Sequence, residues 1–188
     1  MMQNDLKNAV EILKKGGVIL YPTDTIWGIG CDATNKEAVA RIYMIKKRED
    51  SKSMLVLMEN PALLERYVDE VPEIAWELVE ISTTPLTVIY LNAKNLASNL
   101  LAEDGSIGIR FTKEEFTMKL LQQFRRPIVS TSANISGEKA PAFFGEISEE
   151  IINQVDYVVE YRQNDTLPAR PSGIIKLWPG GRIEIIRK

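Results

Sequence analysis

A row of polar side chains at residues 130–137 has a spacing that could bind a phosphate or a ribose. The stretch reads STSANISG and follows an apolar pair. Because strand side chains alternate with a period of two, an extended chain would place Ser130, Ser132, Asn134 and Ser136 on one face. Three hydroxyls and an amide there would offer hydrogen bonds to anionic oxygens without adding charge. The alternative is a turn whose serines and threonine bind their own backbone.

A second polar group, formed by Thr23, Asp24 and Thr25, directly follows a short apolar run that predicts a buried strand. Gly28 and Gly30 come next, and glycine lets the backbone approach a ligand or turn without a steric penalty. The alternative interpretation is a polar loop that leads into another strand.

Cationic side chains gather between residues 46 and 52, where Lys46, Lys47 and Arg48 are followed by Lys52. Lysine supplies a mobile point charge and arginine a planar fork, so the run could neutralise a polyphosphate. The alternative is a solvated helix end whose cations complement the helix dipole. Arg110 differs, since it ends an otherwise apolar strand, where it would suit a single carboxylate.

The composition narrows the chemistry further. The chain of 188 residues has no histidine, which excludes a Ser-His or Cys-His catalytic pair and any His-ligated metal. The single cysteine, Cys31, is interpreted as a buried small residue. A net charge of −3 and a pI near 5.2 provide no overall field for nucleic acid. Without a membrane-span or signal-peptide pattern, a cytoplasmic protein with no membrane partner is expected.

Apolar patterning predicts the elements that position these residues. Helical periodicity or capping residues appear at 5–15, at 34–46 with Thr34 and Glu37 as a capping box, and at 60–68, 72–81, 112–126 and 147–155. Strands are expected at 18–21, 54–58, 87–91, 106–111 and 157–160, and another starts at 128 and runs into the polar segment 130–137. A hairpin is expected at 174–187.

The alternation of strands and helices indicates one α/β domain over residues 1–188, with a twisted mixed sheet flanked by helices. Neither a P-loop nor a Rossmann glycine motif occurs, so these two modes of nucleotide binding are not expected. Ligands of open α/β sheets bind where strands end, so segments 21–25 and 130–134 are predicted to line one cleft.

The motifs of this chain, taken in the order in which they occur, resemble those of the YrdC-like family, whose best-known members are L-threonylcarbamoyladenylate synthases. They are YPTDT-x-x-G-x-GCDA at 21–33, the Lys-x-Arg at 46–48 with Lys52, a strand ending in Arg110, the loop at 130–137, Pro171 with Ser172, and Arg187. The likeness covers nearly the whole chain. It implies synthesis of threonylcarbamoyl-AMP from L-threonine, bicarbonate and ATP with release of pyrophosphate, the first step of the t6A modification of tRNA.

The resemblance also implies a site, in which Lys46 and Arg48 are the catalytic residues. ATP would contact Lys46, Arg48, Lys52, Ser106, Ser132, Asn134 and Arg187. Threonine would contact Thr25, Arg110, Ser130 and Ser172. Mg²⁺ would bridge the ATP phosphates, with protein ligands that the sequence leaves unnamed. The implied partners are downstream threonylcarbamoyl-transfer machinery and a weak tRNA contact.

The chain departs from the family pattern at several positions. These are Ser82, Thr83 and Thr84 in place of Trp-Pro-Gly, Leu57 in place of a common histidine, Ser53 in place of a proline, Ala140 in place of a serine, and Gly173 in place of a threonine. The departures bear on threonine specificity more than on nucleotide binding. Two other functions stay open, namely a family paralogue that binds a nucleotide with another substrate, and an RNA-binding module.

Overall fold

A mixed sheet organises the chain, and the computed structural model describes residues 2–48, 54–166 and 170–188. The nine strands found there run in the order β7-β1-β2-β6-β3-β5-β4-β8-β9. Their bounds are β1 Ile19–Tyr21, β2 Gly28–Gly30, β3 Leu55–Met58, β4 Leu86–Tyr90, β5 Ile107–Phe111, β6 Ile128–Ser132, β7 Tyr157–Val158, β8 Gly173–Leu177 and β9 Ile183–Arg187. Three of the eight pairings are parallel, β1 with β7, β3 with β5 and β4 with β8. The α/β class and the mixed sheet are therefore confirmed.

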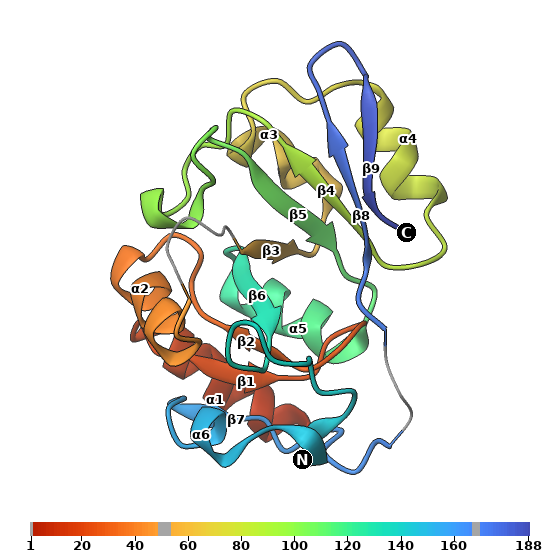
Figure 1. Ribbon diagram of the computed structural model, residues 1–188. Coiled ribbons are helices and arrows are strands. Elements are labelled where there is room, and N and C mark those ends of the chain that lie inside the picture. The colour runs from red at the N-terminus through yellow and green to blue at the C-terminus, as the bar shows by residue number, and fades with distance from the viewer. Residues whose placement is uncertain (1, 49–53, 167–169) are drawn as a thin grey trace.

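Helices flank this sheet. The α-helices are α1 Met2–Lys14, α2 Lys36–Ile45, α3 Leu64–Tyr67, α4 Ile74–Ile81, α5 Glu115–Phe124 and α6 Glu149–Ile152, and the 3₁₀ turns are η1 Pro61–Leu63, η2 Ser98–Leu100 and η3 Phe144–Glu146. In Figure 1, α1, α3, α4 and α5 lie behind the sheet, and α2 lies at its left-hand side. In the described part of the chain, no helix has both the length and the apolar content needed to cross a membrane.

The start of α2 differs from the expected capping box. The side chain that accepts the N–H of Ala38 belongs to Asn35, at 3.0 Å. Thr34 instead donates its hydroxyl to Oδ1 of the buried Asp32, at 2.7 Å. Asparagine is among the best N-cap residues, and the buried carboxylate of Asp32 needs the threonine donor. The predicted helix is therefore correct and the predicted cap is wrong by one residue.

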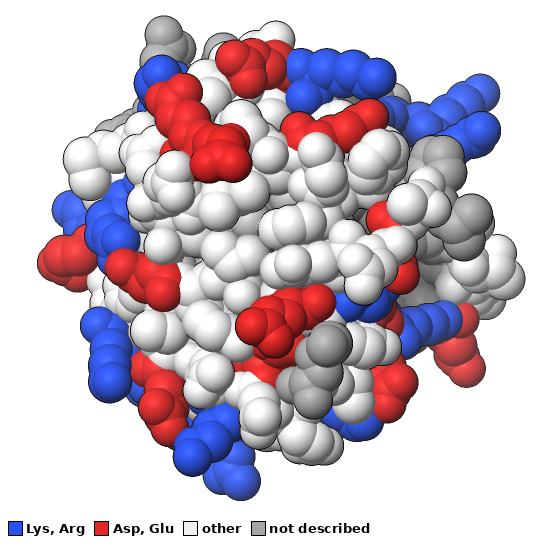
Figure 2. Space-filling view, turned by 90° about the horizontal axis from the view of Figure 1, so that it is seen from below, with Lys and Arg blue, Asp and Glu red and all other residues white. Residues whose placement is uncertain are grey.

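The surface charges lie interspersed on the face shown in Figure 2, where acidic and basic side chains alternate around a broad uncharged area. Inside the molecule, Cys31 has no exposed surface, and burial raises the pKa of its thiol well above the ordinary value. A thiol that resists ionisation is a poor nucleophile, which agrees with the predicted packing role.

The two motif glycines serve packing between strands. A Cβ on Gly30 would lie 2.6 Å from the Tyr21 ring and 2.6 Å from the carbonyl oxygen of Val129. A Cβ on Gly28 would lie 3.1 Å from Oγ of Ser130. Both glycines are in β2, which pairs with β1 on one side and β6 on the other. The expected close approach is therefore made by neighbouring protein groups, and it brings the two polar segments together.

Replacing Gly30 should destabilise the fold, because the new methyl group must displace a strand backbone. We expect Gly30→Ala to lower the free energy of unfolding by about 1–3 kcal/mol, the usual cost of overpacking. Gly145→Ala is the control, since its added Cβ would meet only ordinary contacts at 3.5 Å or more. Urea unfolding of both variants measures the difference, and equal stabilities would contradict this packing role.

Candidate active site

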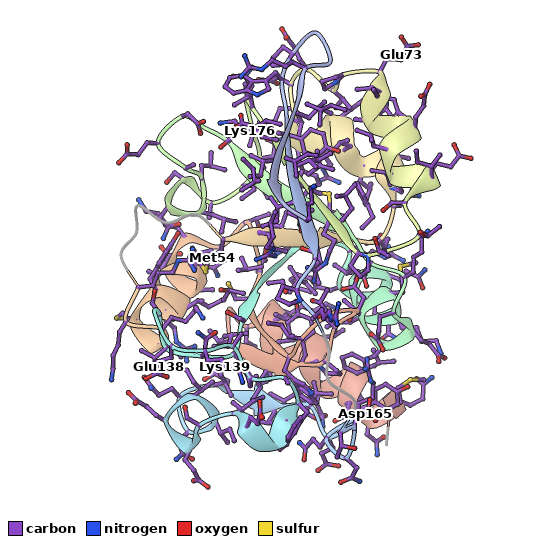
Figure 3. The ribbon with its side chains drawn as sticks, turned by 45° about the vertical axis from the view of Figure 1, so that its right-hand side comes forward. Met54, Glu73, Glu138, Lys139, Asp165 and Lys176 are labelled. Carbon is purple, nitrogen blue, oxygen red and sulfur yellow. The ribbon has the colours of Figure 1, made fainter. Side chains whose placement is uncertain are left out.

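A cleft of about 290 Å³ opens where β2, β3, β5, β6 and β8 meet. Seven of the predicted site residues line it: Thr25, Arg48, Arg110, Ser130, Ser132, Ser172 and Arg187. Thr25 and the end of β6 thus share one cleft, as predicted for segments 21–25 and 130–134. Met54, labelled in Figure 3, also lines it beside the start of β3. The cleft therefore combines three guanidinium groups with hydroxyls from separate parts of the chain.

Arg110 is the most deeply buried cation of this cleft. Its residue is only 3% exposed, because β5 lies near the middle of the sheet between β3 and β4. Its Nη2 lies 3.1 Å from Oδ1 of Asp24, in an ion pair that is not aligned as a hydrogen bond. Within the described residues, Nε of Arg110 has no hydrogen-bond partner. A buried donor without a partner is costly, so the site favours an anionic ligand there.

Burial and the partner act in opposite directions on this pair. Burial lowers the pKa of the Arg110 guanidinium, while the field of Asp24 raises it. Burial also disfavours the charged form of Asp24, which raises the pKa of its carboxyl, and Arg110 opposes that shift. The pair therefore needs its two members together, since either charge alone would be left desolvated.

The hydroxyl groups beside Arg110 form a small network. Ser130 and Ser172 are 5% and 2% exposed. The hydroxyls of Ser172 and Thr87 lie 2.8 Å apart, and Nε of Arg187 donates to the carbonyl oxygen of Ser172 at 2.9 Å. These bonds fix the segment after the undescribed residues 167–169 against β4. The network thereby orients Arg187 at the edge of the cleft.

Lys46 and Asn134 do not line the cleft. Lys46 is 1% exposed, and its ammonium donates to the carbonyl oxygens of Ser132 and Asn134, the latter at 2.6 Å. Burial and, to a smaller extent, Arg48 lower the pKa of Lys46 to about 8. The ammonium thus holds the end of β6 in place, so its protein contacts make it a positioning residue. Its predicted catalytic and ATP-binding role stays a prediction.

The expected row of polar side chains continues only to Ser132, where β6 ends. Asn134 lies in the turn that follows, and its amide donates to the carbonyl oxygens of Ile135 and Glu138 at 2.9 and 2.8 Å. The alternation rule fails at that point because a turn has no period of two. Ser130 and Ser132 therefore reach the cleft, while the asparagine serves the turn, as the alternative interpretation had it.

Ser106, another predicted residue, does not line the cleft. Ser106 precedes β5, four residues before Arg110, and its N–H donates to Oδ1 of Asp104 at 3.1 Å. Lys176, labelled in Figure 3, pairs with the same Asp104 at 2.7 Å, outside the cleft. Lys52 and Ser53 lie outside the described residues, so the predicted ATP contact of Lys52 stays a prediction.

Among the departures from the family pattern, Ala140 lines the cleft. Leu57 is fully buried and pairs with Arg110 across β3 and β5. Gly173 starts β8, and a Cβ there would have ordinary contacts of 3.7 Å or more. The short segment 82–84 lines a different cavity. Among the described departures, Ala140 alone lines the cleft.

The residue that sequence reasoning missed is Asp24. The sequence interpretation provided Arg110 with no protein carboxylate and left it for a ligand. A signal was present, because a buried arginine nearly always has an acidic partner and Asp24 lies in the loop just after the buried strand β1. What the sequence lacked was the spatial proximity of the β1–β2 loop and the end of β5.

Comparisons with known proteins identify the family of this chain. The family model of Sua5, YciO and YrdC proteins, described as "Telomere recombination", matches residues 11–188. The chain belongs to this family. Members similar to it include the threonylcarbamoyl-AMP synthase of Pseudoalteromonas translucida, 34% identical over 161 residues, or 84% of this chain and 86% of that protein. The putative threonylcarbamoyl-AMP synthase of Methanocaldococcus jannaschii is 33% identical over 180 residues, or 93% and 83%.

Solved structures of the Sua5/YciO/YrdC family share the fold. Escherichia coli YciO superposes with a TM-score of 0.85 and 27% identity, over 100% of this chain and 90% of that chain. Pyrococcus abyssi Sua5 in complex with L-threonine superposes with a TM-score of 0.83 and 24% identity, over 95% of this chain. This chain spans only 53% of that Sua5 chain, and at this identity the likeness shows the fold alone.

Removing only the carboxylate of the Asp24–Arg110 ion pair should destabilise the fold more than removing both charges. We expect Asp24→Asn to lower the free energy of unfolding by about 3–5 kcal/mol, because it leaves a desolvated guanidinium without its counter-charge. The double variant Asp24→Asn with Arg110→Met should recover most of that loss. Urea unfolding of the two single variants and the double variant completes a double-mutant cycle. Additive losses would contradict a coupled buried pair.

Proposed function

We propose that this chain is a threonylcarbamoyl-AMP synthase. The observation that carries the proposal is Arg110, a buried guanidinium with an unpartnered Nε in a cleft that also contains Arg48 and Arg187. One anion at Arg110 and a polyphosphate at the other two arginines would match L-threonine and ATP. The names of the bacterial and archaeal relatives support the same activity.

In the proposed reaction, the amine of threonine combines with bicarbonate to form a carbamate and water. A carbamate oxygen then attacks the α-phosphorus of ATP, and the bond to the β-phosphate bridging oxygen breaks to release pyrophosphate. The product is threonylcarbamoyl-AMP. The step depends on alignment of the two substrates and on cations at the phosphoryl oxygens. A chain without histidine can therefore perform it.

The cleft residues divide naturally between the two substrates. Arg110 would take the threonine carboxylate in bidentate fashion, with Ser130, Ser172 and Thr25 around the rest of the amino acid. Arg48 and Arg187 would bind phosphate oxygens, and Ser132 would add a hydroxyl donor. Lys46 would act through the loop that it holds. We keep Lys52, Ser106 and Asn134 as proposed ATP contacts, since no ligand-bound form tests them.

Mg²⁺ would arrive with ATP. In the described residues, no group of three His, Cys, Asp or Glu side chains is placed to hold a metal. The described lining of the cleft offers hydroxyls and arginines and no carboxylate, so the ion would be held chiefly by phosphate oxygens and water. When bound, the ion neutralises charge on the phosphates. We further propose a cytoplasmic location, transfer of the product to downstream threonylcarbamoyl-transfer machinery, and a weak tRNA contact.

The activity can be tested by product analysis. Incubation of the protein with ATP, Mg²⁺, bicarbonate and L-threonine should give the mass of threonylcarbamoyl-AMP, and pyrophosphate release should stop when any one substrate is omitted. Serine should react more slowly by roughly 10- to 200-fold, because it lacks the methyl group of threonine. Pyrophosphate release without an amino acid would instead favour a nucleotide-binding paralogue. Salt-sensitive RNA binding without turnover would favour an RNA-binding module.

Substitution of Arg48 and of Arg110 should weaken the binding of different substrates. We expect Arg48→Ala to weaken ATP binding by roughly 10- to 150-fold, the value of one charge-assisted hydrogen bond, and to leave threonine binding without nucleotide nearly unchanged. Arg110→Ala should have the opposite effect. Arg66→Ala is the control, since this exposed arginine of α3 lies outside the cleft.

Calorimetric titration of each ligand into each variant measures these affinities, with circular dichroism to confirm folding. Should Arg110→Ala fail to fold, Arg110→Lys keeps the charge and loses the planar fork. The assignment is wrong if both arginine variants weaken ATP and threonine alike.

A further inference from the structure

A second cavity, larger than the active-site cleft, lies between α4, α5 and the ends of β4 and β5. Its volume is about 630 Å³. Phe111 of β5 lines it, whereas the neighbouring Arg110 lines the cleft. Because successive strand residues point to opposite faces, the two spaces lie on opposite sides of β5. Nothing in the proposed reaction uses the second cavity.

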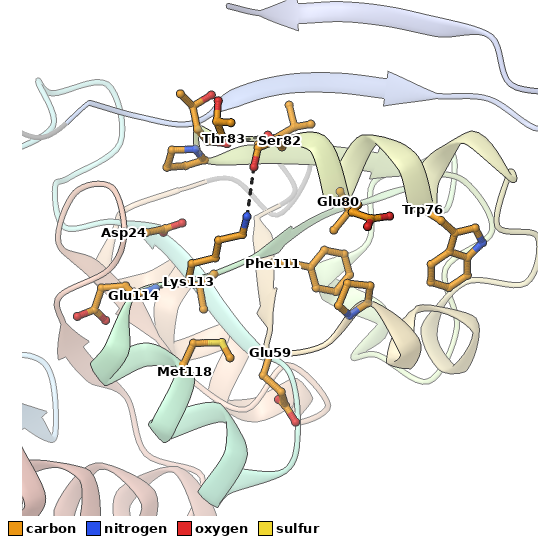
Figure 4. Close-up of a pocket in the computed structure, with 16 residues that line it drawn as sticks. Asp24, Glu59, Trp76, Glu80, Ser82, Thr83, Phe111, Lys113, Glu114 and Met118 are labelled. Atoms are coloured by element: carbon orange, nitrogen blue, oxygen red, sulfur yellow. Dashed lines mark hydrogen bonds between the residues drawn. The ribbon is translucent and has the colours of Figure 1, made fainter.

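The walls of this cavity are largely apolar. Figure 4 shows Phe111 near its centre, Trp76 towards the α4 side and Met118 on α5. Val79 and Leu86 also line it. All five side chains are only partly buried, so apolar surface remains open to a ligand. A volume of this size lies within the range of roughly 300–1,000 Å³ that suits small organic molecules.

The charged residues around this apolar surface are mostly acidic. Carboxylates of Asp24, Glu59, Glu80 and Glu114 line the cavity, against the single ammonium of Lys113. That ammonium donates to the carbonyl oxygen of Ser82 at 3.3 Å, as the dashed line in Figure 4 shows. The rim therefore presents a negative potential to an incoming ligand.

Two of these carboxylates already have protein partners. Asp24 forms the ion pair with Arg110, and Glu114 caps α5 and lies 3.4 Å from Nη1 of Arg162. The carboxylates of Glu59 and Glu80 make no hydrogen bond or ion pair with another described residue, although Glu80 itself is part of helix α4. They come from separate elements, the end of β3 and the last turn of α4. Both remain available to a cation that occupies the cavity.

We propose that this cavity binds an amphipathic organic cation, with an aromatic or branched apolar body and one ammonium or guanidinium group. The body would lie against Trp76 and Phe111, and the cationic group would lie at the rim with Glu59 and Glu80. Burial of apolar surface favours binding, and the carboxylates select the sign of the charge. A fatty acid or a nucleotide would bring negative charge to a rim that is already negative.

Three compounds with the same apolar body test the choice of charge: 4-phenylbutylamine, 4-phenylbutanol and 4-phenylbutyrate. Calorimetric titration should give an affinity for the amine that exceeds that for the carboxylate by roughly 10-fold or more, with the alcohol between them. High salt should reduce the preference. Equal affinities, tighter binding of the carboxylate, or no saturable binding of the amine would overturn the proposal.

The tryptophans report where the amine binds. Trp76 lines this cavity, Trp27 lines the active-site cleft and Trp178 lines neither. In ¹⁵N-labelled protein, the amine should shift the indole resonance of Trp76 and leave that of Trp27 in place. A shift at Trp27 alone would place the amine in the cleft and refute the proposed site.

Substitutions at the rim complete the test. Glu59→Gln and Glu80→Gln should each weaken the amine several-fold and leave the alcohol unchanged. Glu77→Gln is the matched control, since Glu77 is exposed on the same helix as Glu80 and does not line the cavity. Ser82→Trp should block all three compounds by filling the space, with circular dichroism to confirm folding. Unchanged amine affinity in both rim variants would contradict the assigned carboxylates.

Discussion

The buried charge of Arg110 is the constraint on which the rest of the site depends. A buried guanidinium requires a nearby carboxylate, and Asp24 can supply one only if the β1–β2 loop returns to the end of β5. That return depends on β2, a strand of three residues whose glycines fit between β1 and β6 without side chains. Asp24 therefore balances the charge of Arg110 but leaves its Nε–H without a hydrogen-bond acceptor. A substrate carboxylate would supply that acceptor.

A second buried cation performs a different task. Lys46 caps the C-terminus of α2 and donates to two backbone carbonyls, of Ser132 at the end of β6 and of Asn134 just beyond it. The N–H of Ser136 in turn donates to the carbonyl oxygen of Lys46 at 2.8 Å. These contacts join two segments about ninety residues apart in the chain. The loop at 130–137 therefore has a fixed shape before any ligand binds. Such preorganisation reduces the ordering cost of binding a nucleotide beside it.

Local patterns in the sequence predicted most of the fold. The apolar runs at 18–21, 54–58 and 106–111 each became a strand, because a short apolar segment between polar ends is stable chiefly in a buried sheet. The same patterns placed Thr25 and Ser130 at strand ends, and strand ends meet at one cleft. The local run of cations at 46–52 indicated Arg48. Motif resemblance added Ser172 and Arg187, which lie too far from the other site residues in the chain for local patterns to relate them.

Features that depend on contacts between distant segments could not be predicted in this way. The Asp24 partner of Arg110 follows from a loop path, and no residue spacing encodes it. The long side chain of Lys46 could point to solvent, to a ligand or to the backbone, and only the packed structure selects among these. Asn134 was placed on a strand face by alternation, but β6 ends two residues earlier because the asparagine amide stabilises a turn.

The central claim is that the free edge of Arg110 receives the carboxylate of the amino-acid substrate. A crystal structure of the protein soaked with L-threonine tests it directly. We expect the threonine carboxylate within hydrogen-bond distance of Nε of Arg110, with Asp24 still paired to Nη2. A carboxylate bound elsewhere, with Arg110 in contact only with protein atoms, would contradict the account.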